Sequence, residues 1–235
     1  MDTIIFDLDD TLADTYRATK KANRALFFHL LRTGRLRLVK ALLLREHTDF
    51  LMSREDILLY DSHDFIAHFI RDADPGMPQD RIDAACTLYD RAFFSAFGLV
   101  EGARDLLTFL NPRYRLALVT DGAKRWQEEK LRRLGIAPFF DRIIISGEVG
   151  SSKLNDENFH MALEGGEDRV YVVGDRLETD IRGGNAIGAT TILVRRGTFA
   201  YDRETDIVPD VTVTSLAELY RVFPAESNPT PTKGL

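Results

Sequence analysis

The pattern of apolar and polar residues changes twice along the chain. Residues 3–6, TIIF, form a short continuous apolar run, which predicts a strand buried on both faces. Over residues 16–97 apolar residues recur at three- and four-residue spacing, which predicts helices. Gly34 is expected to divide the first helical run, and two further helices are expected over residues 57–72 and 79–97.

After Gly98, short runs rich in Val, Ile and Leu alternate with helical patterns. Strands are expected over residues 115–120, 142–146, 169–175 and 189–194, with an edge strand over 210–213. Helices are expected over residues 123–134, 155–164, 178–187 and 216–223. This alternation predicts an α/β protein with a Rossmann-like parallel sheet, right-handed crossovers and helices on both faces.

The first strand belongs to this sheet, although about a hundred residues separate it from the next strand. The all-helical block is therefore expected to be an insertion. The predicted division is an α/β core domain over residues 1–15 and 98–224, with a helical cap domain over 16–97. The polar, proline-bearing segment 225–235 is expected to be disordered.

Composition narrows the class of protein. The chain has 235 residues, 44% apolar and 29% charged, and a net charge of −6 argues against a general nucleic-acid partner. No membrane association or secretion is expected, because no apolar run approaches the roughly 20 residues of a span and no basic leader precedes the first strand. The single cysteine, Cys86, excludes an intramolecular disulfide and fits a reducing, cytoplasmic compartment. The oligomeric state stays open.

Carboxylates crowd the end of the first strand. Asp7, Asp9 and Asp10 follow it within four residues. Such a cluster is costly on its own, because like charges repel and burial disfavours ionised forms. A bound cation is the simplest compensation. Asp10 and Thr11 are expected to be structural, as a turn and a helix N-cap.

The later strand ends also carry polar groups. Thr120, Asp121 and Gly122 follow the second strand, and a loop of small residues after the third leads to Lys153. Asp175 and Asp180 follow the fourth strand. Ligands of open α/β sheets gather at the carboxyl ends of the strands, so a site suited to phosphate and metal is expected there.

Four segments of the chain together resemble the motifs of the haloacid dehalogenase-like (HAD) hydrolase superfamily. They are FDLDDTL, LVTDG, SGEVGSSK with the later NF, and VVGDRLETD. The likeness spans most of residues 2–197, and Gln127, Lys130 and Leu131 follow the second motif as in many relatives. The helical block occupies the place of the family's C1 cap, as in phosphoglycolate phosphatase-like members. The chain departs from the pattern at Leu154, where proline is usual.

This resemblance implies roles for the acidic residues. Asp7 would be the nucleophile that forms an aspartyl-phosphate, and Asp9 would protonate the leaving oxygen and then activate water. The acid at Asp9 favours a phosphatase over a dehalogenase, because a halide needs no proton. Mg²⁺ would be held by Asp7, the backbone carbonyl of Asp9 and Asp175, with Asp180 close by. A simple helix N-terminal charge is the alternative role for Asp180.

The resemblance also implies a phosphate site. Thr120 and backbone N–H groups near Asp121 and Gly122 would bind phosphate oxygens, although Asn is commoner than Asp at position 121. Lys153 would counter the charge of nucleophile and phosphate. Lys124 and Lys130 are alternatives for that role.

The expected function is Mg²⁺-dependent hydrolysis of a small phosphorylated metabolite. A phosphotransferase or phosphomutase, and a non-catalytic phosphate-binding regulatory protein, are the alternatives. Phosphoglycolate, sugar phosphates, nucleotides and pyrophosphate all stay open as substrates.

The basic run over residues 16–45 allows two interpretations. It holds nine Lys and Arg and no acidic residue, whereas residues 46–90 hold eleven Asp and Glu. Arg17, Lys20, Lys21 or Arg24 could contact the distal part of an anionic substrate. The run could instead be a solvated face, a subunit contact or a membrane-surface helix.

Overall fold

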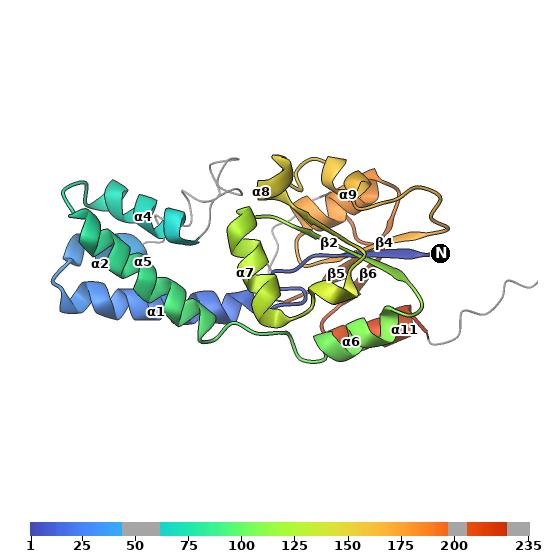
Figure 1. Ribbon diagram of the computed structural model, residues 1–235, viewed down its shortest axis with the longest axis horizontal. Coiled ribbons are helices and arrows are strands. Elements are labelled where there is room, and N and C mark those ends of the chain that lie inside the picture. Colours follow the sequence, from blue (N-terminus) through green and yellow to red (C-terminus); the bar gives the residue numbers. More distant parts are fainter. Residues whose placement is uncertain (44–61, 197–205, 225–235) are drawn as a thin grey trace, which may run out of the picture.

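The computed structural model describes residues 1–43, 62–196 and 206–224 (Figure 1). The tail expected to be disordered, residues 225–235, lies outside this part. So do the first five residues of the helix expected over 57–72. None of the described helices has both the length and the apolar character that crossing a bilayer requires.

A six-stranded sheet forms the centre of the α/β part, with strand order β3-β2-β1-β4-β5-β6 and parallel pairing throughout. The predicted Rossmann-like α/β class is therefore confirmed. The strands are β1 (Thr3–Phe6), β2 (Arg115–Thr120), β3 (Arg142–Ile145), β4 (Val170–Gly174), β5 (Thr190–Val194) and β6 (Val211–Val213). Phe6 of β1 pairs with Leu118 and Val173, so the ends of β1, β2 and β4 meet at one edge of the sheet.

Helices cover both faces of the sheet, because its strands are apolar on both sides. On one face Ile4 and Phe6 pack with residues of α6, α7 and α11, and on the other Ile5 packs with Phe159 of α9. Figure 1 shows α6 and α11 on one side of the sheet and α9 on the other. These helices are α6 (Ala103–Leu110), α7 (Lys124–Leu134), α8 (Ser146–Val149), α9 (Glu157–Met161), α10 (Arg182–Ala186) and α11 (Leu219–Val222).

The helical block between β1 and β2 has a hydrophobic core of its own, which includes Leu26, Ile70 and Ile82. Its described helices are α1 (Thr15–Arg32), α2 (Leu36–Leu43), α4 (Ser62–Ala73) and α5 (Gln79–Phe94). They lie beside the sheet domain (Figure 1). The separate core supports the proposed division into a core domain over residues 1–15 and 98–224 and a cap over 16–97.

Several segments differ from the expectations. The helix expected over 216–223 is divided into a 3-10 turn, Leu216–Glu218, and α11, and the helix expected over 155–164 covers only Glu157–Met161. Residues 146–149, expected as part of a loop, form the short helix α8. Helix α6 was not expected, because eight residues give only about two turns of periodicity. The helix expected over 178–187 is divided into a π-helical turn, η3 (Leu177–Ile181), and α10. Strands β1 and β2 have the expected bounds.

Candidate active site

Asp7 lies directly after β1 at the carboxyl edge of the sheet and is buried, with 6% of its surface exposed. Its Oδ1 accepts a hydrogen bond from Lys153 Nζ. Its Oδ2 is also buried but has no hydrogen-bond partner. A buried carboxylate oxygen without a donor is costly, so this atom is suited to an electrophile or a cation.

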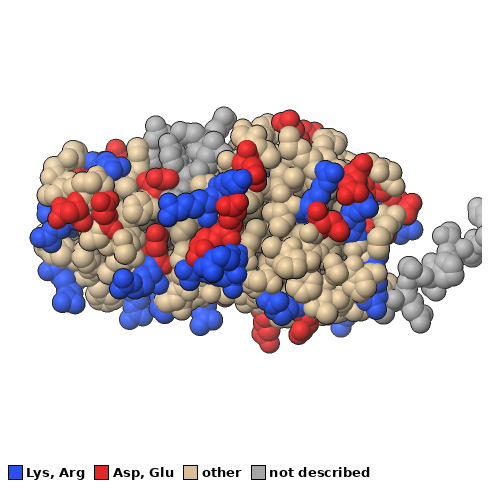
Figure 2. Space-filling model, in the orientation of Figure 1, with Lys and Arg blue, Asp and Glu red and all other residues tan. Residues whose placement is uncertain are grey.

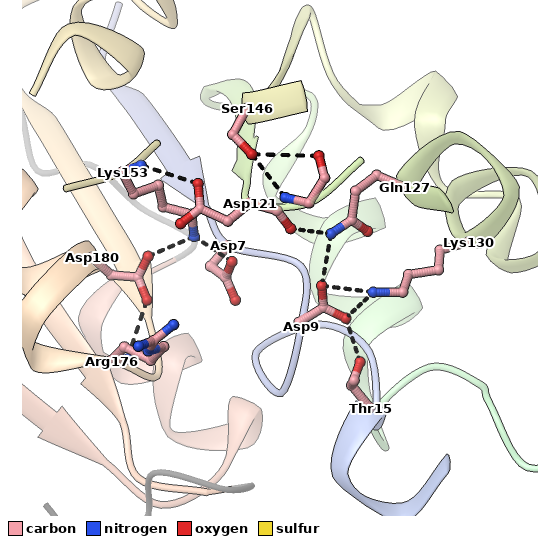
Figure 3. A network of polar contacts seen from close by, with 11 residues as sticks. Asp7, Asp9, Thr15, Asp121, Gln127, Lys130, Ser146, Lys153, Arg176 and Asp180 are labelled. Carbon is pink, nitrogen blue, oxygen red and sulfur yellow. Dashed lines mark hydrogen bonds and ion pairs between the residues drawn. The ribbon is translucent and has the colours of Figure 1, made fainter. Parts of the chain in front are cut away.

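Lys153 joins residues from three strand ends (Figure 3). Its Nζ contacts Asp7 and lies 2.7 Å from Asp180 Oδ1, and its backbone N–H donates to Asp121 Oδ1 at 3.0 Å. The second oxygen of Asp180 accepts the Arg176 backbone N–H at 3.1 Å. The lysine is 3% exposed, and the neighbouring carboxylates hold its pKa above the usual range although burial alone would lower it.

Asp7, Asp175 and Asp180 form an acidic triad in which one oxygen from each lies within 4.8 Å of the others. Burial, and then the neighbouring carboxylates, raise the pKa of Asp7 to about 7 and that of Asp175 well above its usual range, against the opposing charge of Lys153. One ammonium does not neutralise three carboxylates. The donor set of hard oxygens and the unpartnered Asp7 Oδ2 fit a divalent cation such as Mg²⁺.

Gly174 at the end of β4 makes this triad compact. A Cβ at position 174 would lie 2.3 Å from both Cβ and Cγ of Asp180. Glycine therefore lets the η3 turn fold back over the strand end and bring Asp180 beside Lys153.

The loop after β2 supplies a second set of groups. Thr120 is fully buried and its Oγ1 has no hydrogen-bond partner, which leaves the hydroxyl for a ligand. Gly122, at φ +135°, donates its N–H to Ser146 Oγ at 2.8 Å, so this amide already has an acceptor. Burial raises the pKa of Asp121, although Lys153 lies beside it.

Asp9 has a different set of partners, from α1 and α7 (Figure 3). Its carboxylate accepts hydrogen bonds from Thr15 Oγ1 at 2.5 Å, Gln127 Nε2 at 3.0 Å and Lys130 Nζ at 2.7 and 2.9 Å. Burial alone would raise the pKa of Asp9, but the charge of Lys130 and these hydrogen bonds outweigh it and lower the pKa. The side chain is thus held as a carboxylate in one orientation.

The three candidate lysines are placed differently. Lys153 contacts Asp7, Lys130 contacts Asp9, and Lys124 forms an exposed ion pair with Glu148 at 2.5 Å. Of the three, only Lys153 contacts Asp7 among the described residues.

Asp10 and the basic run have other contacts. Asp10, at φ +60°, accepts the Tyr16 backbone N–H at 2.7 Å in the first turn of α1, whose N-cap is Asp14 and not Asp10 or Thr11. Lys20, Lys21 and Arg24 line a shallow hollow on the exposed side of α1. Lys and Arg side chains gather over α1 along the lower edge of the face in Figure 2. Among the described residues, no ion pair joins this basic run to Asp7, Asp175 or Asp180.

Sequence reasoning assigned no role to Thr15, Ser146 or Gln127, and it offered Lys130 only as an alternative to Lys153, not as a partner of Asp9. A signal for the last two exists in the sequence. Gln127 and Lys130 lie at helical spacing with Leu131 and Leu134, so two polar residues fall on the buried face of an amphipathic helix. Buried polar residues need partners, and such positions point to a polar network.

The family model described as haloacid dehalogenase-like hydrolase matches residues 1–188. The chain belongs to this family. The resemblance inferred from the four motifs is confirmed, and the chain is a HAD-like hydrolase.

Named relatives agree with that class. The glyceraldehyde 3-phosphate phosphatase of Methanopyrus kandleri is 32% identical over 231 residues, which cover 93% of this chain and 95% of that protein. The pyrimidine 5'-nucleotidase YjjG of Escherichia coli is 35% identical over 154 residues, 61% of this chain and 67% of its own. The structure of the HAD-hydrolase YfnB from Bacillus subtilis bound to magnesium has a TM-score of 0.65 and 25% identity, covering 94% of this chain and 97% of that one. The predicted enzyme class, a hydrolase of phosphoric monoesters, is confirmed by these phosphatase relatives.

Proposed function

We propose that this HAD-like hydrolase is a Mg²⁺-dependent phosphatase that hydrolyses a small phosphomonoester through an aspartyl-phosphate on Asp7. The observation that carries the proposal is the environment of Asp7. One of its oxygens is held by Lys153 while the other is buried without a partner, at the point where three strand ends meet. That is the arrangement of a positioned nucleophile.

In the first half of the reaction, an oxygen of Asp7 forms a bond to phosphorus as the bond between phosphorus and the leaving oxygen breaks. Lys153 and the unpartnered hydroxyl of Thr120 would stabilise the charge on the phosphoryl oxygens. Asp9, a carboxylate in the free site, would take up a proton from solvent before this step and transfer it to the leaving oxygen, so that an alcohol departs and Asp9 is left as a carboxylate again.

In the second half, Asp9 would accept a proton from a water molecule as the water oxygen attacks phosphorus. The bond between phosphorus and the Asp7 oxygen then breaks, which releases inorganic phosphate and regenerates the Asp7 carboxylate. Asp7 would thus act as the nucleophile, and Asp9 would transfer the protons.

Asp7, Asp175 and the backbone carbonyl of Asp9 would hold the Mg²⁺ ion, with Asp180 beside them. When bound, the ion supplies positive charge that lets an anionic nucleophile approach an anionic phosphate. Two findings support this part of the proposal: the buried acidic triad and the likeness to a magnesium-bound structure. Asp180 contributes one oxygen to the triad and accepts a hydrogen bond from Lys153 Nζ, so it would hold the lysine in place.

The proposed substrate is a small phosphorylated metabolite. The names of the relatives, a sugar-phosphate phosphatase and a nucleotidase, support this class without selecting one member. A phosphotransferase or mutase would use the same residues with a sugar hydroxyl in place of water.

Phosphate release across a panel of sugar phosphates, nucleotides, phosphoglycolate and pyrophosphate tests the proposal, with Mg²⁺ and with a chelator. We expect Mg²⁺-dependent release that disappears in Asp7→Asn, whose amide keeps the shape of the carboxylate but is a poor nucleophile. Undiminished activity in Asp7→Asn would refute the mechanism. Phosphoryl transfer between sugar phosphates without release would favour the mutase, and binding without turnover would favour the regulatory protein.

A further inference from the structure

We propose that Lys130 is a positioning residue that fixes the orientation of the Asp9 carboxylate, and that it does so from a site where the helical block contacts α7. The inference rests on the proposed function, because it concerns the proton transfer assigned to Asp9.

The Lys130 ammonium and the Asp9 carboxylate form a bidentate pair. Lys130 Nζ lies 2.7 Å from Asp9 Oδ1 and 2.9 Å from Oδ2, so the ammonium contacts both oxygens of one carboxylate. Gln127, one turn earlier on α7, donates to Oδ2 at 3.0 Å. A carboxylate held at both oxygens by two side chains of a single helix has little rotational freedom.

Lys130 is also buried. Lys130 is 4% exposed, although most lysines are at the surface. A buried ammonium is costly unless it is paired, and among the ion pairs of the described residues the carboxylate partner of Lys130 is Asp9. Lys124, on the same helix, has 48% of its side chain exposed and pairs with Glu148 instead. The contact with Asp9 therefore explains why this lysine is buried.

Two aromatic rings surround the Lys130 ammonium. It lies 5.9 Å from the ring centres of both Phe93 on α5 and Trp126 on α7, within reach of a cation–π interaction. These rings pack on each other at 5.2 Å, and Thr15, the third partner of Asp9, begins α1. Residues of both the helical block and the α/β core thus surround the Asp9 carboxylate and its lysine partner.

The consequence concerns the leaving group. Departure of an alkoxide needs a proton from Asp9 as the phosphorus–oxygen bond breaks, so it depends on where the Asp9 oxygens lie. Departure of p-nitrophenolate, a stable anion, needs little protonation. Loss of Lys130 should therefore harm alkyl phosphates more than p-nitrophenyl phosphate.

The test compares kcat/KM of the full chain for glycerol 3-phosphate and p-nitrophenyl phosphate, since kcat/KM includes leaving-group departure. For Lys130→Met, which keeps the length and the apolar stem, we expect a loss of about 10²-fold with the alkyl phosphate. The loss with p-nitrophenyl phosphate should stay within about threefold. Lys124→Met is the matched control on α7 and should change neither value.

A double-mutant cycle separates positioning from stability. In an Asp9→Asn background, Lys130→Met should cause little further loss with the alkyl phosphate, because the group that it positions is already absent. Equal losses with both substrates, no loss, a gain, or additive losses in the cycle would overturn the proposal while leaving the Asp7 chemistry intact. Lys130→Gln replaces the Met variant if that variant does not fold, with the same expectations.

Discussion

The ammonium of Lys153 bridges two carboxylates that follow different strands, since it contacts Asp7 after β1 and lies 2.7 Å from Asp180 after β4. All three residues are buried. The chain thus places one cation among several anions, and the balance of charge in this cluster determines several properties of the protein.

Lys153→Met should therefore lower both stability and turnover. The variant leaves buried carboxylates without their cation, which costs about 3–5 kcal/mol in the free energy of unfolding without added metal. If Lys153 faces the phosphoryl group as proposed, loss of its charge should lower kcat about 10³-fold. Urea unfolding and phosphate release measure the two effects.

The matched control is Lys124→Met, because Lys124 forms an exposed pair with Glu148. Its free energy of unfolding should change far less than that of Lys153→Met, because an exposed ion pair contributes little to stability. A stability loss as large as that of Lys153→Met would contradict the explanation from buried charge.

The raised pKa values predict how the stability of the metal-free protein depends on pH. Burial raises the pKa of Asp7 to about 7, and Asp175 is raised as well. In the unfolded chain these two carboxyl groups lose their protons at about pH 4. Between these values the folded state binds more protons, so the free energy of unfolding falls as pH rises towards about 7.

Mg²⁺ should reverse this loss, because it replaces the protons that the acidic triad holds at low pH. We expect Mg²⁺ to raise the Tm more at about pH 8 than at about pH 5. Asp7→Asn is the control and should reduce both the pH dependence and the Mg²⁺ effect. The same Mg²⁺-induced Tm shift at both pH values would contradict a site made of these carboxylates.

The sequence was enough to predict the sheet and the acidic residues at its edge. Continuous apolar runs such as TIIF and RLALVT identify strands without further information, and Asp7 and Asp175 follow such runs directly. Parallel order then brings the strand ends together.

The contact between α7 and the loop after β1 was harder to predict. Lys130 lies 121 residues from Asp9, and its role depends on how α7 packs beside the loop after β1. Pairing at such separation depends on tertiary packing rather than on local pattern. The two polar residues on the buried face of α7 were a sign that a partner exists, but not which one.

Gly174→Ala should disrupt the site through a steric contact. The new Cβ would lie 2.3 Å from Cβ of Asp180, a distance at which Asp180 or the η3 backbone must move. A displacement of about 1 Å in the catalytic cluster should lower kcat about 10²-fold. Steady-state kinetics and Tm of the variant measure this.

Gly76→Ala provides the control, because its nearest neighbouring atom would be 4.0 Å away. It should retain activity. Normal turnover in Gly174→Ala would mean that the position of Asp180 is not needed for catalysis.

Asp121 holds the loop that carries Lys153, because its Oδ1 accepts the Lys153 backbone N–H at 3.0 Å. An asparagine has an oxygen in the same place and no charge, so Asp121→Asn should keep this hydrogen bond. Its kcat/KM should stay within about threefold of the original enzyme.

Asp121→Ala leaves the Lys153 amide without its acceptor and loosens the loop that places the ammonium, so kcat/KM should fall about tenfold or more. Kinetics of the two variants, with urea unfolding to confirm their folded state, decide the matter. Equal activity of the Asn and Ala variants would show that the hydrogen bond does not position Lys153, whereas a large loss in the Asn variant alone would assign a role to the negative charge itself.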